Sequence, residues 1–567
     1  MRPRRLIPLL LLLAAAVHAE TVTVTLLATS DLHGNVYPYD YYTGKPAQRG
    51  LAKIATLIRE ARRANPNSIL IDCGDTIQGS PLESVYQGYV RLGRLPQALR
   101  WSGPVPSQDP MMAVMNALGY QTMVPGNHEF NFGAKNFEKA RREAKFPWIT
   151  ANITAEPGSP FQPFQPYVLL TAGGVRVAVI GITTPNIPAW EPPEHYRGLR
   201  FLDGVVAAQQ AVREVRQKHR PDLVIAAVHA GLGSDPRPNS QYRPRRAENM
   251  VLQIARRVAG IDAIVYGHSH QQEDGRLVNG VLLVQPKNWG SSLAKLDFEL
   301  ARNGSRWKLQ HKKSRLMAVR AETSADEEVL RLARPYHELA EAYLETPIAT
   351  APSELSGARG RMEDTALVDA VHEVQLHYTK ADVSFTALFN PQVRVAKGPV
   401  TVRQIAALYL YDNELYAVEG TGRMVKDALE NAARFFLSCP TPLCDRGPLV
   451  NRSVMGYNFD MAQGVSYEID LTKPAGQRIV NLRWKGKPLA PDQKLRIAIN
   501  NYRAGGSGGY DMFRNARIVW RSNEDIRSLI VSYYLEKGRL PEKPDGNWRI
   551  IPESARRTLE AELAGAH

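Results

Sequence analysis

Residues 22–34 read VTVTLLATSDLHG, and this stretch decides the fold class. The run 22–27 is apolar and β-branched, which is typical of a buried strand. It leads within a few residues into Asp31 and His33, beside Gly34. Polar side chains just past the carboxyl end of a strand lie where open α/β sheets build their sites. The stretch therefore predicts a strand of an α/β sheet that ends at a functional site.

Metal-type donors recur in four further segments of the first half of the chain. These segments are Gly74-Asp75 after the apolar run 68–71, Gly126-Asn127-His128-Glu129, His229 after the run 223–228, and Gly267-His268-Ser269-His270 after the run 263–266. Carboxylate, amide and imidazole groups are donors that Zn, Mn or Fe accept. One such motif alone is most often a turn or a satisfied polar residue. Five in one order are a strong joint signal for a metal site at the ends of these strands.

Strands and helices alternate from about residue 21 to 315, which predicts an α/β sandwich. Residues 50–64 and 205–218 show the apolar periodicity of amphipathic helices, and apolar runs at 175–180 and 281–285 predict further strands. A charged helical stretch, 324–344, with Pro347 soon after it, indicates a linker to a second α/β domain. The expected organisation is a first domain at 20–320, a linker helix at 321–347, a second domain at 348–535 and a C-terminal appendage at 536–567.

Composition narrows the class of protein without deciding its function. The 567 residues are 44% hydrophobic and 22% charged, which is close to the globular average and excludes a disordered or fibrous chain. The formal net charge of +15 suits an anionic substrate, but it also suits nucleic acid or a membrane surface. Lys and Arg are scattered, and no basic run coincides with exposed aromatic residues, so we expect no nucleic-acid partner.

The N-terminus predicts an exported protein. Three arginines within residues 1–5 precede an apolar run, 6–17, which is followed by a small residue, Ala19. This pattern is typical of a secretory signal peptide. The alternative, a transmembrane anchor, requires about 20 apolar residues, and the run is shorter. We expect cleavage near Ala19, a periplasmic or secreted mature protein, no stable membrane insertion and a monomer.

The three cysteines fit an oxidising compartment. Cys439 and Cys444 bracket a short loop and are expected to form a local disulfide. The alternative is half of a metal site, but no second Cys or His pair lies near in sequence. Cys73 lies in an apolar run and is expected to be a buried free thiol.

The ordered segments resemble the metallophosphoesterase superfamily, whose signature is D-x-H, G-D, G-N-H-E, H and G-H-x-H. The resemblance implies a four-layer αββα sandwich with two divalent metal ions, for which Mn, Zn, Fe and Co all stay possible. Two metal ions suit phosphoryl transfer because they stabilise the attacking and leaving oxygens and acidify water.

The same resemblance implies a role for each residue of the signature. Asp75 bridges the two metals, and His128 donates to the phosphate oxygens as charge develops in the transition state. Asp72 and Glu129 are expected to support the ligands rather than bind metal. The remaining ligands divide into two sets: Asp31, His33 and His270 for one metal, and Asn127, His229 and His268 for the other.

Within that superfamily the chain looks like the secreted nucleotidases, which add a C-terminal substrate domain. In 5′-nucleotidases the Gly-Asn-His-Glu segment continues Phe-Asp, and that Asp pairs with the catalytic His; here it continues Phe130-Asn131. An Asn does not stabilise an imidazolium as a carboxylate does. The Asn form is the one seen in bacterial periplasmic 2′,3′-cyclic-nucleotide 2′-phosphodiesterase/3′-nucleotidases, which segments 40–42, 75–82 and 500–504 also resemble. Asn131 is therefore expected beside His128 in the catalytic site.

The second domain is expected to hold the base between two aromatic rings. Tyr502 resembles one wall, and Tyr411 is the choice for the other, with Tyr409 as the fallback; for the latter two, packing into the core is the alternative. Such stacking contributes about 1–3 kcal/mol per base. An Asp of the glycine loop grips the ribose in 5′-nucleotidases, and Gly508 stands in its place. Arg503 is expected to be exposed. The other candidate substrate-binding residues are Asn501, Gly505 and Gly506.

The expected activity is hydrolysis of 2′,3′-cyclic nucleotides to 3′-nucleotides, followed by removal of the 3′-phosphate. The two domains imply a hinge near residues 324–347. One alternative is a 5′-nucleotidase or UDP-sugar hydrolase, which shares the ligand set; another is a sulfur-ester hydrolase. A third, from another class, is a non-catalytic nucleotide-binding or adhesin-like protein, against which the complete ligand set argues.

Overall fold

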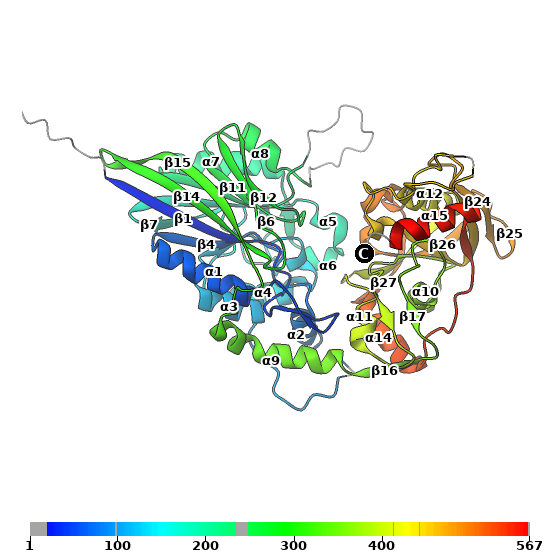
Figure 1. Ribbon diagram of the computed structural model, residues 1–567. Helices are drawn as coiled ribbons and strands as arrows, with labels where there is room; N and C mark the ends of the chain where they lie inside the picture. Colours follow the sequence, from blue (N-terminus) through cyan, green and yellow to red (C-terminus); the bar gives the residue numbers. More distant parts are fainter. Residues whose placement is uncertain (1–19, 97–98, 234–247, 412, 442, 565–567) are drawn as a thin grey trace, which may run out of the picture.

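The computed structural model describes residues 20–96, 99–233, 248–411, 413–441 and 443–564, and it has two lobes (Figure 1). The helix α9 (Glu327–Leu344) runs along the first lobe and ends beside the strand β16 (Pro347–Ala351) of the second. The expected signal peptide, residues 1–19, lies outside the described residues. Within the described ranges no helix combines the length and the hydropathy that crossing a bilayer requires.

Two mixed sheets form the centre of the first lobe. One has the order β15 (Arg306–Ala318), β14 (Ser292–Asn303), β1 (Thr21–Thr29), β4 (Ser68–Asp72), β5 (Thr122–Met123). The other has the order β12 (Glu273–Val278), β13 (Val281–Gln285), β11 (Ala263–Tyr266), β10 (Leu223–His229), β8 (Val175–Thr183), β7 (Tyr167–Ala172). Strands β1, β4 and β5 pair in parallel, as do β8, β10, β11 and β13. Their carboxyl ends therefore point to a common rim in each sheet.

The sheets face one another, and helices cover both outer faces. Along β1, Val24 and Leu26 point into the core between the sheets, whereas Leu27 points toward the helices on the outside, because side chains alternate along a strand. Helix α1 (Leu51–Ala64) belongs to the core on that outer face, and α7 (Gly204–Lys218) belongs to the core outside the second sheet. The four-layer αββα sandwich is confirmed.

The second lobe is also α/β, and its described residues form two larger sheets beside two-stranded ones. The larger has the order β22 (Asp460–Gln463), β18 (Val383–Ala387), β26 (Lys494–Asn500), β21 (Glu414–Thr421), β27 (Ile518–Asp525). The smaller has the order β25 (Lys487–Pro488), β24 (Ile479–Trp484), β23 (Val465–Asp470), β28 (Trp548–Ile551). Several helices pack on them, among them α10 (Ala366–Thr379), α12 (Gly422–Ala432) and α14 (Ile526–Lys537). The second lobe therefore has the α/β character expected from the sequence.

The C-terminal residues are part of this second lobe. Strand β28 pairs in parallel with β23, and the helix α15 (Glu553–Ala564) buries Ala555 and Leu559 completely in the core of the lobe. The boundary expected at residue 535 therefore coincides with no break in the packing. The structure also joins Cys439 and Cys444 in a disulfide bond, while Cys73 is a buried free thiol.

Candidate metal centre and substrate site

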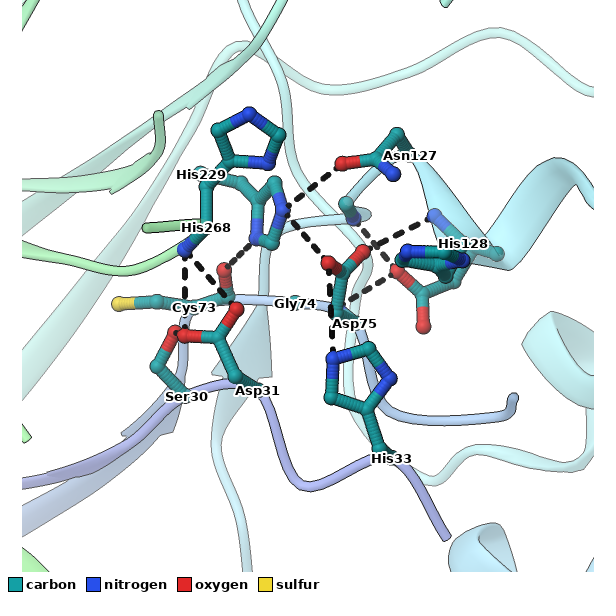
Figure 2. Close-up of polar contacts among 12 residues, drawn as sticks. Ser30, Asp31, His33, Cys73, Gly74, Asp75, Asn127, His128, His229 and His268 are labelled. Carbon is teal, nitrogen blue, oxygen red and sulfur yellow. Dashed lines mark hydrogen bonds and ion pairs between the residues drawn. The ribbon is translucent and has the colours of Figure 1, made fainter. Parts of the chain in front are cut away.

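The candidate ligands meet at the rim where the strands of both sheets end. Asp31 follows β1 and Asp75 follows β4, whereas His229 ends β10. In each of two groups the potential ligand atoms lie within 4.8 Å of one another: Asp31, His33 and His270 in one, Asp75, His229 and His268 in the other. Donors that are scattered over some 240 positions of sequence thus converge on two adjacent sites. Figure 2 shows the members of this set other than His270.

Asp75 lies between the two groups. Its Oδ2 atom is 3.0 Å from Nε2 of His229 and 3.9 Å from Nε2 of His33, which belongs to the other group (Figure 2). Asn127 joins the His229 side, with its Oδ1 atom 3.2 Å from His229 Nε2. On the other side, Nε2 of His33 is 3.0 Å from Nε2 of His270. Facing donor atoms at these distances suit two cations with Asp75 between them.

Backbone carbonyls orient two of the histidines. Nδ1 of His33 is 2.9 Å from the carbonyl oxygen of Gln78, and Nδ1 of His229 is 2.7 Å from that of Cys73. A carbonyl oxygen only accepts, so each Nδ1 carries a proton and Nε2 is the ring atom that faces the site. His268 is held through Nε2, 3.0 Å from a carboxylate oxygen of Glu248, which leaves its Nδ1 for a metal ion.

The surroundings of the candidate ligand histidines lower the pKa of two of them and raise the pKa of a third. Burial and the neighbouring His270 lower the pKa of His33 to about 3, and burial lowers the pKa of His270 to about 4. Both rings are therefore neutral, the form that binds metal. At His229 burial acts in the same direction, but the Asp75 carboxylate outweighs it and raises the pKa to about 10. A cation that binds there must displace a proton.

The backbone at the site adopts conformations that non-glycine residues rarely take. Five of the seven candidate ligands have positive φ angles of 47–71°: Asp31, His33, Asp75, His268 and His270. Such angles strain an L-residue and cluster at functional sites. The glycines nearby allow close approach, because a Cβ atom on Gly126 would lie 2.2 Å from Asp75 Oδ1. One on Gly267 would lie 1.8 Å from Ser30 Oγ.

Glu129 and Asp72 hold the ligand loops from behind. The fully buried carboxylate of Glu129 accepts backbone N–H bonds from Asp75 at 2.9 Å and Gly126 at 2.5 Å, and others from residues 76 and 77. Asp72 accepts from the backbone of Gly74 at 2.8 Å. These carboxylates therefore fix the two loops that carry Asp75 and the adjacent Gly-Asn-His segment.

His128 lies at the edge of the same centre. Its backbone N–H donates to Oδ1 of Asp75 at 2.9 Å, and its ring is 5.1 Å from the ring of His33. Nδ1 of the ring is 2.6 Å from Oδ1 of Asn131. Asn131 in turn donates through Nδ2 to a carboxylate oxygen of Glu191 at 2.6 Å. Sequence reasoning paired Asn131 with His128 but missed Glu191 and Glu248, since neither belongs to a recognisable motif.

The tyrosines of the second lobe differ in exposure. Tyr411 is 43% exposed and Tyr502 is 36% exposed, whereas Tyr409 is fully buried and belongs to the core. Tyr457, which sequence reasoning missed, has its ring 6.5 Å from that of Tyr411. Burial, together with the other phenols, raises the pKa of Tyr502 to about 12. Tyr411 and Tyr502 therefore remain available to a ligand, and Tyr409 does not.

The glycine loop of the second lobe touches the first lobe beside the metal centre. The Asn501 side chain donates to the carbonyl of Trp190 at 2.9 Å, and the Trp190 ring lies 5.6 Å from that of His268. A Cβ atom on Gly505 would lie 2.3 Å from the carbonyl oxygen of Ala189. This loop and the short helix α5 (Ile187–Trp190) therefore bring the two lobes together next to a candidate ligand.

Two residues of the loop segment have roles other than those expected. Arg503, expected to be exposed, is 1% exposed and pairs with the Asp460 carboxylate through two hydrogen bonds of 2.8 Å. Its guanidinium points into the lobe because it pairs there with this buried carboxylate. Asn501 uses both ends of its amide in protein contacts, since its Oδ1 accepts from the backbone of Glu414 at 3.2 Å. A Cβ atom on Gly506 would lie 2.7 Å from the Arg514 side chain, so this glycine permits a close internal approach.

Comparison with known families gives a match for each of the two lobes. Residues 24–272 match the model of the calcineurin-like phosphoesterases, a family with a dimetal centre, and residues 345–515 match the model of the 5′-nucleotidase C-terminal domain. The chain is 30% identical to the 2′,3′-cyclic-nucleotide 2′-phosphodiesterase/3′-nucleotidase of Yersinia enterocolitica, covering 97% of this chain and 92% of that protein. It is also 30% identical to the trifunctional nucleotide phosphoesterase YfkN of Bacillus subtilis, but it spans only 41% of that longer protein.

A solved structure shows the same fold. A Staphylococcus aureus protein described as a 5′-nucleotidase, in complex with α-ketoglutarate, superposes with a TM-score of 0.76 at 24% identity, covering 93% of this chain and all of that one. The fold and the paired metal sites define a two-domain metallophosphoesterase. The chain belongs to the 5′-nucleotidase family, whose members join a calcineurin-like phosphoesterase domain to a nucleotidase C-terminal domain, and it is a metal-dependent phosphoester hydrolase.

Proposed function

We propose that this hydrolase opens 2′,3′-cyclic nucleotides to 3′-nucleotides and then releases the 3′-phosphate. The observation that carries the proposal is the position of the glycine loop against Trp190, which brings the lobe with the exposed tyrosines beside the candidate ligand His268. The relatives from Yersinia enterocolitica and Haemophilus influenzae, each covering nine-tenths or more of the chain, carry the name of this activity.

The seven donors hold two divalent cations in this proposal. Asp31, His33 and His270 would hold one ion, Asn127, His229 and His268 would hold the other, and Asp75 lies between the two groups. When bound, the two ions polarise the phosphoryl oxygens and lower the pKa of water, which is the chemistry that phosphoester hydrolysis requires. The donor set suits Mn, Zn, Fe or Co.

His128 then acts on the substrate rather than on metal. Its Nδ1 faces Asn131, so Nε2 is the ring atom left for a phosphate oxygen. The pKa of His128 is raised because the charge of Asp75 and the hydrogen bond to Asn131 outweigh burial. A protonated ring donates to an oxygen that gains negative charge in the transition state.

The second lobe supports recognition of a nucleoside whose 2′ and 3′ oxygens carry the phosphate. Tyr411 and Tyr502 offer faces for stacking on the base. Position 508 has no room for a side chain that grips the ribose: φ is 72°, and a Cβ atom there would lie 2.4 Å from Asn458 Oδ1 and 2.5 Å from Arg503 Nη1. The missing side chain leaves the 2′ and 3′ oxygens free to carry phosphate.

We further infer that the protein acts outside the cytoplasm. The inference rests on the basic and apolar N-terminal pattern of residues 1–19 and on the local Cys439–Cys444 disulfide, which suits an oxidising compartment.

Relative rates test the proposal. The metal-loaded protein should hydrolyse 2′,3′-cyclic AMP and 3′-AMP faster than 5′-AMP, with 3′-AMP as the transient product of the first reaction. The matched control is Asp75→Asn, which keeps the shape of the side chain but removes its charge. Activity confined to 5′-AMP contradicts the proposal in favour of a 5′-nucleotidase. Tight nucleotide binding without turnover favours a non-catalytic protein.

A further inference from the structure

A chain of polar contacts leads from His128 away from the metal centre and into the second lobe. Nδ1 of His128 is 2.6 Å from Asn131 Oδ1, and Asn131 Nδ2 is 2.6 Å from Glu191 Oε1. The second oxygen of Glu191 is 2.9 Å from Nδ1 of His195. Nε2 of His195 is 3.8 Å from Oε1 of Glu414, which lies on β21 of the second lobe.

The outer members of this series are shielded from water. The side chains of Glu191, His195 and Glu414 are 4%, 13% and 13% exposed. Hydrogen bonds in such surroundings are stronger than in water, and an unmatched polar atom is more costly. The orientation of each group is therefore dictated by its neighbours.

The side-chain amide of Asn131 fits its place in the series in either of two orientations, because its oxygen and NH₂ ends differ in chemistry but hardly in shape. With Oδ1 toward His128, the histidine donates from Nδ1; with Nδ2 toward His128, it must accept there. An ionised Glu191 only accepts hydrogen bonds, so it faces the Asn131 NH₂ group. The Oδ1 atom is thereby left for His128, and Nδ1 of the histidine must donate.

We propose that Glu191 is a positioning residue that supplies, through Asn131, the carboxylate that the His128 site lacks, and that His195 links this control to Glu414 of the second lobe. The inference rests on the proposed function, because it assigns His128 to the reaction. Among the residues that the structure describes, the hydrogen-bond partners of the Glu191 carboxylate are Asn131 and His195, neither of which is a candidate metal ligand. Glu191 acts on catalysis by fixing which end of the Asn131 amide His128 meets.

The link to the second lobe follows from the place of Glu191 in the chain. It comes directly after α5, whose Trp190 accepts from Asn501, and before the short helix α6 (Pro193–Tyr196), which carries His195. Glu414 also donates its backbone N–H to Asn501. The stretch 187–196 therefore contacts both Asn131, the partner of His128, and the second lobe. We expect the ring of His128 to be held best when the lobes adopt this arrangement.

Exchange of the two polar groups provides the test. Glu191→Gln keeps the shape of the side chain at position 191 but lets the Asn131 amide turn. The NH₂ group of the introduced glutamine donates to Asn131, where the carboxylate of Glu191 accepted. Asn131→Asp places a carboxylate opposite Glu191, and the two repel one another. The double variant Asn131→Asp/Glu191→Gln restores one carboxylate and one amide in reversed order. In that variant the introduced aspartate accepts from His128, and the introduced glutamine donates to the aspartate.

We expect kcat to fall by about 10- to 100-fold in each single variant and to return to within about tenfold of the wild type in the double variant, as coupled neighbours do. KM for 3′-AMP and the bound metal should stay unchanged. The same pattern should appear with bis(p-nitrophenyl) phosphate, which has no base to stack on tyrosines. A general distortion of the substrate domain would instead raise KM for the nucleotide alone.

The matched control is Glu194→Gln. Glu194 lies three residues further along and also reaches the second lobe, 3.5 Å from Arg521, but its ion pair is with that arginine rather than with a member of the series. Its kcat should equal that of the wild type. Glu414→Gln tests the second arm and should lower kcat less than Glu191→Gln does, because it acts through two more residues, His195 and Glu191.

The outcomes separate the two proposals. A wild type that hydrolyses none of the nucleotides contradicts the proposed function. An active wild type with single variants of unchanged kcat overturns the role of Glu191. Should a single variant unfold, the double variant still decides, since its net charge equals that of the wild type. A folded, metal-loaded double variant no better than Asn131→Asp also overturns the role.

Discussion

Five of the candidate ligand residues have backbone φ angles in the left-handed region. Buried hydrogen bonds around them hold this strained backbone in place. Strain of this kind persists only where the surroundings determine the geometry fully. At the centre of these contacts is Asp75, which is 1% exposed. Its two neighbours His33 and His229 belong to different candidate metal sites.

Replacement of Asp75 by Asn should remove this connection. An amide is a poor bridge between two cations, so we expect at least one metal to be lost and kcat to fall by about a thousandfold or more. Metal analysis beside steady-state kinetics measures both effects. Asp297→Asn, on β14 away from the rim, is the control and should keep its metal and its activity. Full activity in the Asp75 variant would contradict the bridging role.

Metal binding should also depend on pH through His229. In the metal-free protein Asp75 raises the pKa of His229 to about 10, so the ring is protonated at neutral pH and must lose that proton to a cation. The apparent metal affinity should therefore rise with pH below that pKa, about tenfold per pH unit for each proton released. Titration calorimetry in two buffers of different ionisation enthalpy counts the protons. Release of no proton at about pH 7.5 would refute the prediction.

At the level of elements, the ends of the parallel strands position the candidate metal ligands, and the glycine loop brings the second lobe beside them. The parallel strands other than β5 were predictable, because they are apolar runs that are largely buried, as in β10, where all seven residues are buried. The two-residue strand β5 was not predicted. The metal site was predictable as well, since donors that follow parallel strands share one rim. Contacts made by single residues such as Glu191 and Glu248 were not, because they arise only when distant segments pack. The expected exposure of Arg503 was wrong, because its partner Asp460 lies 43 positions away.

The two exposed tyrosines lead to a prediction about binding. Tyr411→Ala and Tyr502→Ala should each raise KM for 3′-AMP by about 5- to 150-fold, which corresponds to the roughly 1–3 kcal/mol of one stacked ring. KM and kcat for bis(p-nitrophenyl) phosphate should stay the same, since this substrate has no base. Tyr409→Phe is the comparison in the core and should change stability more than KM. Equal loss on both substrates would argue against a base clamp.

For the whole molecule, the metal centre connects the two sheets of the first lobe. Asp31 and Asp75 follow strands of one sheet, whereas His229 and His268 lie at the ends of strands of the other. Cations bound by these candidate ligands should therefore stabilise the sandwich in addition to their chemical role. A ligand that binds only the folded state contributes about 2.7 kcal/mol when its concentration is about 100-fold above Kd.

Removal of metal should therefore lower the Tm of the first lobe. Calorimetry before and after exhaustive chelation should show one transition move to lower temperature and return when metal is added. The second lobe has a core cluster and a disulfide of its own, although another cluster continues into it from the first lobe, so its unfolding temperature should fall less than that of the first lobe. A chelated protein with unaltered unfolding and undiminished phosphoesterase activity would contradict the metal assignment.

The last strand of the chain has a consequence for how the protein can be shortened. Because β28 covers one side of β23, a polypeptide that stops at residue 535 leaves that side open, with unpaired N–H and C=O groups. Open edges of this kind recruit other chains. Light scattering should show that the truncated protein self-associates. The chain that includes β28 should not, because β28 pairs with this edge of β23.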